Sequence, residues 1–196
     1  MAHGTISVGK TIRGENIEIK GIGEYIKPVK AKRGSIGYDL AVPEDVVIPA
    51  HSRTVVRLNF AINLPFGCEA KIEPRSGMSS KGMEGYGIRK EYRKFLKFFR
   101  RKVKVFGLYR FNADVLVGKV DPLYTGSVGI IIKNDDEQFE IRKGTRIAQM
   151  TIYRVPPVRF IEVEELSCES RGGGFESSGT SSADNNEELP PTRLCN

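Results

Sequence analysis

The stretch Val56-Arg57-Leu58-Asn59-Phe60-Ala61-Ile62-Asn63-Leu64 decides the fold class, because large apolar side chains occupy every second position. An apolar period of two is typical of a β-strand with one buried face, and the turn residues Pro65-Phe66-Gly67 end it. Residues 68–73 repeat the alternation. Residues 128–132 are apolar apart from one glycine, which predicts a strand buried on both faces, and residues 146–155 form a β-branched stretch. Many short strands predict an all-β sandwich or barrel.

One segment between these strands has a different period. Between Ile88 and Val103, six apolar residues recur at helical spacing and lysines and arginines fill the other face, which predicts one inserted amphipathic helix. The apolar stripe consists of Ile88, Tyr92, Phe95, Leu96, Phe99 and Val103. Residues 85–111 hold ten basic residues and one acid, in a chain whose net charge is +7. The positive charge therefore belongs to this insert, and the rest of the chain is close to neutral.

The composition limits the class of protein. With 196 residues, 39% hydrophobic and 28% charged, the chain suits one globular domain with appendages. We expect a β domain over residues 1–166, with the insert at about 85–111, and a flexible Gly-rich arm over residues 167–196. No apolar run approaches the length of a membrane span, and the first residues resemble no secretory signal.

The cysteines and histidines exclude several kinds of chemistry. Cys68, Cys168 and Cys195 stand far apart, which argues against a disulfide framework or a zinc site. We therefore expect a reducing compartment, the cytoplasm or the nucleus, and no secretion. Only His3 and His51 are present, so an enzyme built on this chain has to rely on carboxylates or a metal ion.

Five glycine-rich and polar segments lie where strands end, at residues 34–40, 73–82, 118–126, 144–150 and 171–179. Singly, each is explained by a turn or a linker. Together they offer cations, hydroxyls and backbone N–H groups that can approach phosphate oxygens. Asp39 and Asp121 are candidates for a hydrated Mg²⁺ and a general base, while Tyr124 and Phe175 offer flat faces for a sugar and a base. The set predicts a nucleotide site without histidine.

The order and wording of these segments resemble the five motifs of the trimeric dUTP pyrophosphatases (dUTPases), over residues 34–179. Gly-Tyr-Asp-Leu, Pro-Arg-Ser-Gly and Arg-Ile-Ala-Gln carry most of the resemblance. It implies a jelly-roll-like β-barrel and a homotrimer that shares its active sites between subunits. The Gly-rich arm of one subunit would close over a neighbour's site. The implied reaction is hydrolysis of dUTP to dUMP and pyrophosphate with Mg²⁺.

The resemblance also implies roles for single residues. Asp121 would deprotonate the water that attacks the α-phosphorus, Tyr124 would pack under the deoxyribose, and Asp39 would act on Mg²⁺ through water. Backbone groups from Gly118 to Asp121, among them those of Val120, would read the uracil edge. The remaining implied contacts to phosphates, metal waters or uracil are Arg75, Ser76, Gly77, Gln149, Arg171, Phe175, Ser177 and Ser178.

The sequence also departs from the family pattern, and alternatives follow from that. Glu176 stands where the arm usually has glycine, and Arg171 and Phe175 are four apart instead of five. A non-catalytic, regulatory nucleotide-binding protein is one alternative. A dCTP deaminase on the same fold is another, but it needs a glutamate where residues 130–132 are all isoleucine.

Two interpretations of the insert stay open. In one, its apolar stripe packs on its own subunit or on a trimer neighbour, and the basic residues are solvated. In the other, the basic face, with Phe98 and Phe106 interleaved, docks on nucleic acid or on an acidic protein partner.

Overall fold

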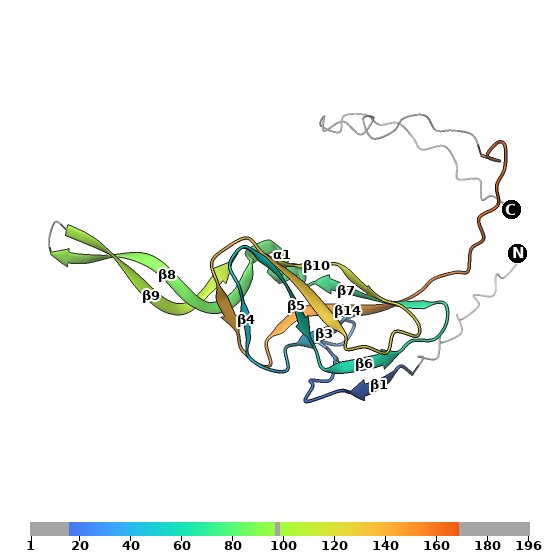
Figure 1. Cartoon of the computed structure of the whole chain (residues 1–196), viewed down its shortest axis with the longest axis horizontal. Helices are drawn as coiled ribbons and strands as arrows, with labels where there is room; N and C mark the ends of the chain where they lie inside the picture. The colour runs from blue at the N-terminus through green and yellow to red at the C-terminus, as the bar shows by residue number, and fades with distance from the viewer. Residues whose placement is uncertain (1–15, 97–98, 169–196) are drawn as a thin grey trace, which may run out of the picture. The chain divides into compact units, whose positions relative to one another are not determined.

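A computed structural model of the chain describes residues 16–96 and 99–168, in two units with the boundary after Pro157. The strands and the short helix that it describes all belong to the first unit (Figure 1). This unit is built mainly of β-strands, as the period-two alternation predicts, and it is jelly-roll-like, as the resemblance implies. Neighbouring strands in its sheets are antiparallel throughout the described pairs.

Four sheets make up the described part of the first unit. The largest has the order β11-β7-β14-β3-β2. Its members are β2 (Val29–Lys30), β3 (Tyr38–Ala41), β7 (Cys68–Pro74), β11 (Gly118–Val120) and β14 (Arg146–Arg154). A second sheet joins β10 (Ala113–Leu116), β12 (Gly129–Asn134) and β5 (Ser52–Arg57). A third joins β4 (Val46–Ile48), β13 (Phe139–Ile141), β8 (Met83–Leu96) and β9 (Phe99–Phe111). The fourth pairs β1 (Glu18–Gly21) with β6 (Phe60–Asn63).

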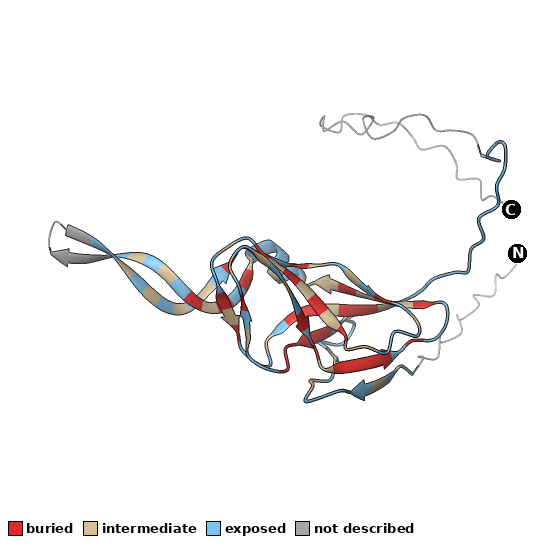
Figure 2. Cartoon of the chain, in the orientation of Figure 1, coloured by how far each residue is buried: buried red, intermediate tan, exposed pale blue. Residues whose placement is uncertain are grey.

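The alternating stretch at residues 56–64 supplies part of the core, although it is not one continuous strand. β5 ends at Arg57 and β6 begins at Phe60, because Asn59 between them adopts a left-handed conformation with φ of 58°. The five large apolar residues of the stretch are nevertheless all buried (Figure 2). Alternation therefore predicted these five buried side chains correctly, although Ala61 is buried as well, and the local break transfers the chain from one sheet to another.

The prediction that residues 128–132 are buried on both faces is wrong for the described chain. Ile130 and Ile132 are fully buried, but Ile131 is only half-buried. In the sheet Ile131 lies opposite Val55, which is itself exposed. β12 therefore covers the core with one face and leaves the other partly open.

The predicted amphipathic helix is also wrong, because the insert is a long β-hairpin. β8 and β9 pair from Met83 opposite Phe111 to Leu96 opposite Phe99. Aromatic and β-branched residues are frequent in both strands, and such residues favour strands. Because side chains alternate along a strand, the expected stripe is split, with Ile88 on one face and Val103 on the other.

The helix that does form is short and lies elsewhere. α1 (Ser76–Lys81) directly follows Arg75 and turns the chain from β7 into β8. Within the described residues, no helix has the length and apolar character needed to cross a membrane.

Candidate functional site

The first part of the site is centred on Asp39, which lies on β3 between β14 and the edge strand β2 of the largest sheet. Asp39 lies on β3 opposite Gln149 of β14, and only 6% of the residue is exposed. The Nε atom of Arg75 lies 3.3 Å from Oδ1 of Asp39, and Nη1 of Arg146 lies 3.2 Å from Oδ2. Both oxygens of one carboxylate therefore hold a guanidinium group, which leaves the cluster with an excess positive charge.

The sheet order explains why these residues meet. β14 runs between β3 and β7, so the end of β7 that leads to Arg75 lies beside both Asp39 and Arg146. Nη1 of Arg75 also donates a hydrogen bond to the carbonyl oxygen of Arg146, over 3.1 Å. The resemblance did not single out Arg146, although this residue stands in the quoted Arg-Ile-Ala-Gln element.

Two further contacts place Gln149 in the same cluster. Its Nε2 lies 3.5 Å from the carbonyl oxygen of Pro74. A Cβ atom added to Gly37 would lie 3.1 Å from Oε1 of Gln149, so the backbone at Gly37 approaches the amide closely. Glycine at this position makes that close approach possible.

Ser76 and Gly77 extend the cluster towards solvent. Both are exposed at the start of α1, directly after Arg75. A Cβ atom on Gly77 would meet nothing within 4 Å, so its backbone faces open space. The structure thus brings together five of the predicted residues, Asp39, Arg75, Ser76, Gly77 and Gln149, around a cationic, solvent-accessible end of the sheet.

Glu73, the carboxylate nearest to this cluster along β7, is already neutralised. Its Oε1 lies 2.7 Å from Nζ of Lys71, and this hydrogen bond raises the pKa of Lys71 above its ordinary value. Because Lys71 offsets the charge of Glu73, the cluster keeps its preference for anions.

The second part of the site is the turn that carries Asp121 and Tyr124, both of which are exposed. The backbone N–H of Tyr124 donates to the carbonyl oxygen of Asp121 over 3.3 Å, and Leu123 between them has a positive φ of 69°. The hydroxyl of Tyr124 donates to the carbonyl oxygen of Ser127 over 3.1 Å. A Cβ atom on Gly126 would lie 2.6 Å from that hydroxyl, so only glycine lets the ring lie over this position.

The two parts of the site do not meet within one chain. β11 pairs with β7 so that Val120, next to Asp121, lies opposite Ala70, whereas Arg75 follows the other end of β7. Five residues of strand separate the two positions, which corresponds to about 16 Å. The predicted arm residues, Arg171, Phe175, Ser177 and Ser178, and also Glu176, lie outside the described residues.

The donor set fits Mg²⁺ that is held mainly by phosphate oxygens, not an all-protein metal site. Among the described residues, no group of three or more histidine, cysteine, aspartate or glutamate side chains could hold a metal ion. Both oxygens of Asp39 already accept hydrogen bonds or ion pairs from arginines. Mg²⁺ commonly keeps several waters and uses few carboxylates when a substrate supplies phosphates.

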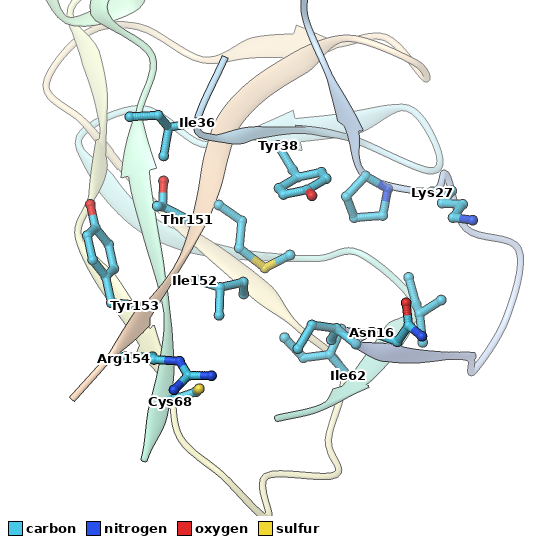
Figure 3. A pocket seen from close by; sticks show the side chains of 14 residues that line it. Asn16, Lys27, Ile36, Tyr38, Ile62, Cys68, Thr151, Ile152, Tyr153 and Arg154 are labelled. Carbon is cyan, nitrogen blue, oxygen red and sulfur yellow. The ribbon is translucent and has the colours of Figure 1, made fainter. Parts of the chain in front are cut away.

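A separate cavity of about 500 Å³ lies near the β1–β6 sheet (Figure 3). Its lining is mostly apolar and includes Tyr38, Ile62 and Ile152, with the cations Lys27 and Arg154 also present. None of the described site residues lines it. Because its lining is mostly apolar and contains none of those residues, we do not place the triphosphate there.

Comparison with known proteins agrees with the sequence motifs. A sequence model of the dUTPase family matches residues 24–102 and 107–179. The deoxyuridine 5'-triphosphate nucleotidohydrolase of Nocardia farcinica is 36% identical over 155 residues, which cover 78% of this chain and 78% of that protein.

Solved structures resemble this chain in fold. A Staphylococcus bacteriophage 80alpha dUTPase with dUPNHPP aligns with a TM-score of 0.65 at 24% identity, covering 85% of this chain and 99% of the other. A mutant dUTPase from S. aureus phage phi11, described for the coordination of a structural Mg(II) ion, aligns with a TM-score of 0.60 at 20% identity, covering 79% and 100%.

Proposed function

The chain belongs to the dUTPase family and is a dUTP diphosphatase, and we propose that two separated groups of residues on different subunits carry out the reaction. The enzyme hydrolyses dUTP to dUMP and pyrophosphate. The observation that supports this division of labour is the cationic cluster of Arg75 and Arg146 on Asp39, at the opposite end of β7 from Asp121.

The cationic cluster binds the triphosphate in this proposal. Arg75 offers its guanidinium group and Ser76 offers its hydroxyl to the phosphates. The backbone of Gly77 faces open space, so phosphate oxygens can approach it. Asp39 and Arg146 hold Arg75 in place, and Gln149 acts through water. Positioning and charge neutralisation of this kind account for most of the catalysis of phosphoryl transfer.

The turn at residues 118–126 binds the nucleoside and provides the base. Asp121 deprotonates the water that attacks the α-phosphorus. Tyr124, whose ring is fixed over Gly126 by the hydrogen bond to Ser127, packs under the deoxyribose. Backbone groups of Gly118 and Val120 read the edge of the uracil.

Mg²⁺ would enter with the triphosphate. When bound, it neutralises charge that develops on the phosphate oxygens. Asp39 is the residue we assign to its water shell. This role is compatible with a carboxylate that is already paired with two guanidinium groups.

A homotrimer assembles the site. The separation of about 16 Å along β7 between Ala70, which lies opposite Val120, and Arg75 supports an arrangement in which a second subunit supplies one of the two groups. The second structural unit also presents apolar side chains, of which Phe160, Ile161 and Leu166 are exposed in the single chain, as expected of residues that an assembly covers. In the arm, Arg171, Phe175, Ser177 and Ser178 complete a neighbour's site.

Release of pyrophosphate from dUTP, dCTP, dTTP and UTP, measured in parallel with Mg²⁺ and with EDTA, tests the activity. We expect turnover of dUTP to exceed that of the other nucleotides by at least about 100-fold, and EDTA to abolish it. Comparable turnover of dCTP or UTP would contradict the assignment.

Subunit mixing tests the shared site. Asp121→Asn and Arg75→Ala homotrimers should each be nearly inactive, whereas co-expressed chains should form mixed trimers in which about a quarter of the sites are intact. No recovery in mixed trimers of the correct mass would mean that each chain builds its own site.

A further inference from the structure

The hairpin of β8 and β9 continues far beyond the sheet that it belongs to. β13 pairs with β8 only at Tyr86 and Gly87, and farther out the register joins β8 and β9 to each other alone. Figure 1 shows this part as a twisted two-stranded ribbon that extends away from the sheets. A lone two-stranded hairpin is marginally stable in water, so a ribbon of this length needs a reason to be kept.

Charge makes the ribbon less stable as it stands. Three like-charged pairs lie directly opposite each other in the register: Lys90 with Lys104, Arg93 with Arg101, and Lys94 with Arg100. Like charges in directly opposed positions destabilise a hairpin, whereas opposite charges would support it. The arrangement is advantageous only when an anion offsets the repulsion.

At the base of the hairpin, the arginines are paired with carboxylates, unlike three of the described cations farther out. Nη2 of Arg89 donates to Oδ2 of Asp136 over 2.8 Å, and Arg110 pairs with Glu84. Farther out, in the part of the chain that the structure describes, Lys90, Arg101 and Lys104 have no carboxylate partner. These three cations are therefore available to a ligand.

The two faces of the ribbon differ in exposure. At positions 88, 90, 92, 102, 104, 106 and 108, which share one face, every residue is exposed and none is acidic. On the other face, residues 89, 91, 103 and 105 are half-buried, and the hydroxyl of Tyr109 donates to Glu91 over 3.0 Å. The ribbon thus packs on itself with one face and presents the other to solvent.

Aromatic rings lie among the cations of the exposed face. Tyr92 is 66% and Phe106 is 60% exposed. Nζ of Lys102 lies 5.7 Å from the centre of the Tyr92 ring, and Phe106 stacks against Tyr86 with ring centres 6.1 Å apart. Cations that alternate with exposed rings match the requirements of a single nucleic-acid strand, whose phosphates need charge and whose unpaired bases need flat surfaces.

We propose that the exposed face of the β8–β9 ribbon, formed by Lys90, Tyr92, Lys102, Lys104 and Phe106, binds single-stranded nucleic acid. An acidic protein would use the cations but would leave the two rings without a function. Near the sheet, Lys90, Lys104 and Phe106 line a groove that also holds Asp136, Glu137 and Glu140. Arg89 pairs with Asp136 and Arg142 pairs with Glu140, so two of these three carboxylates are already offset by cations.

Binding is tested on the full-length protein by fluorescence anisotropy, with a labelled 20-nucleotide oligo(dT) and with a 20-base-pair duplex, at about 50 to 200 mM NaCl. Because phosphate contacts depend steeply on salt, we expect the Kd for oligo(dT) to rise roughly threefold or more across this range. We expect the single strand to bind more tightly than the duplex. No binding at the lowest salt, or tighter binding of the duplex, overturns the proposal.

Two variants of equal charge identify the surface. Lys90→Gln/Lys104→Gln should weaken oligo(dT) binding about tenfold and reduce the slope of log Kd against log salt by about 1.4. Lys20→Gln/Lys32→Gln, which removes two exposed cations elsewhere, should leave binding nearly unchanged. Equal losses in both variants would mean that only net charge matters, and would overturn the proposal.

A ring variant separates a nucleic-acid strand from other polyanions. Tyr92→Leu should weaken oligo(dT) binding about fivefold or more, and Tyr92→Phe should restore it, because stacking needs the ring and not the hydroxyl. Poly-L-glutamate at equal charge should compete poorly. If it competes as well as oligo(dT), the surface is one for acidic proteins.

dUTP hydrolysis and the oligomeric mass should be unchanged in all these variants. A change of mass in Lys90→Gln/Lys104→Gln would assign the ribbon to a subunit interface instead.

Discussion

Arg75, which follows β7, and Asp39 of β3 form an ion pair across the intervening strand β14: Nε of Arg75 lies 3.3 Å from Oδ1 of Asp39. Nη1 of Arg146 lies 3.2 Å from the other carboxylate oxygen. A single buried carboxylate thus holds two cations side by side. Its role in this arrangement is to fix the position of Arg75, which the phosphates of dUTP would contact.

Asp39→Asn keeps the shape of the side chain but removes its charge, so we expect Arg75 and Arg146 to repel each other and Arg75 to lose its position. dUTP hydrolysis should fall by about tenfold or more, on the precedent that positioning of phosphate-binding groups dominates this chemistry. Asp45→Asn is the control. Asp45 also pairs with an arginine, Arg142, but it is exposed, and its carboxylate contacts Arg142 and the backbone N–H of Lys143, not Arg75 or Arg146. Equal activity of the two variants would contradict the role of Asp39.

Asp121→Asn should lower kcat by roughly 10²–10⁴ while the affinity for a non-hydrolysable dUTP analogue stays nearly unchanged, because an amide keeps the turn but cannot accept the proton. Stopped-flow turnover and calorimetric titration measure the two quantities. Asp135→Asn removes an exposed carboxylate that pairs with Lys133 instead and should behave like the wild type. Turnover near that of the wild type in Asp121→Asn would rule out Asp121 as the base.

Asp136 should anchor the base of the hairpin in a pH-dependent way. Burial raises the pKa of Asp136, but the N–H groups of Glu137 and Asn112 and the Arg89 guanidinium outweigh it, so the pKa lies below its ordinary value of 3.8. A lowered pKa in the folded state means that the charged form stabilises the fold above pH 3.8, and that this contribution is lost as the pH falls through the folded-state pKa.

The measurement is the free energy of unfolding of the wild type and of Asp136→Asn across pH 2.5–7, a range that spans the expected change. We expect the wild type to be more stable by roughly 1–3 kcal/mol above about pH 5, with a difference that shrinks below pH 3.8. A difference that stays constant down to the lowest pH would show that the carboxylate charge contributes nothing.

The arm should affect turnover and not assembly. Deletion of residues 171–196 removes the predicted contacts of Arg171 and Phe175, so kcat should fall about tenfold or more. The number of subunits in the oligomer, measured from its mass, should not change. Glu176→Gly should tighten dUTP binding if the carboxylate faces the phosphates. Unchanged affinity would mean that Glu176 points to solvent.

The sequence predicts which side chains are buried better than it predicts the type and the bounds of the secondary-structure elements. Apolar alternation at residues 56–64 identified five buried side chains, because burial depends on the period of the side chains and tolerates a local break. The break itself depends on Asn59, and a single left-handed residue leaves little trace in a hydrophobic pattern. The same limit applies to Leu123 in the turn after Asp121.

The hairpin was mistaken for a helix because Ile88, Tyr92 and Val103 satisfy a helical period by spacing alone. The stretch Lys102-Val103-Lys104-Val105-Phe106 alternates with a period of two and contains β-branched residues, and this was the signal that favours a strand. Pairing with β8 over the length of the hairpin decided the outcome, and such pairing between distant positions is invisible to a local window.

The candidate site was predicted in its residue types and only partly in its geometry. The motif wording pointed to Asp39, Arg75 and Gln149, and the sheet places them together. Arg146 is not singled out by its sequence context, because its contact with Asp39 depends on the register between β3 and β14, which the sequence alone does not specify.

Removing the outer ribbon should separate its function from catalysis. Arg89 lies directly opposite Val105, so replacing residues 90–104 by Asn-Gly closes the strands with a tight hairpin turn and keeps the contact of Arg89 with Asp136. We expect dUTP hydrolysis and oligomeric mass to stay near the wild-type values, since Asp39, Arg75 and Asp121 all lie on other elements. The thermal midpoint should stay equal or rise, because the removed segment pairs with itself and carries opposed like charges. Loss of hydrolysis in a folded trimer of normal mass would show that the ribbon belongs to the active site, and a lower mass would show that it holds the subunits together.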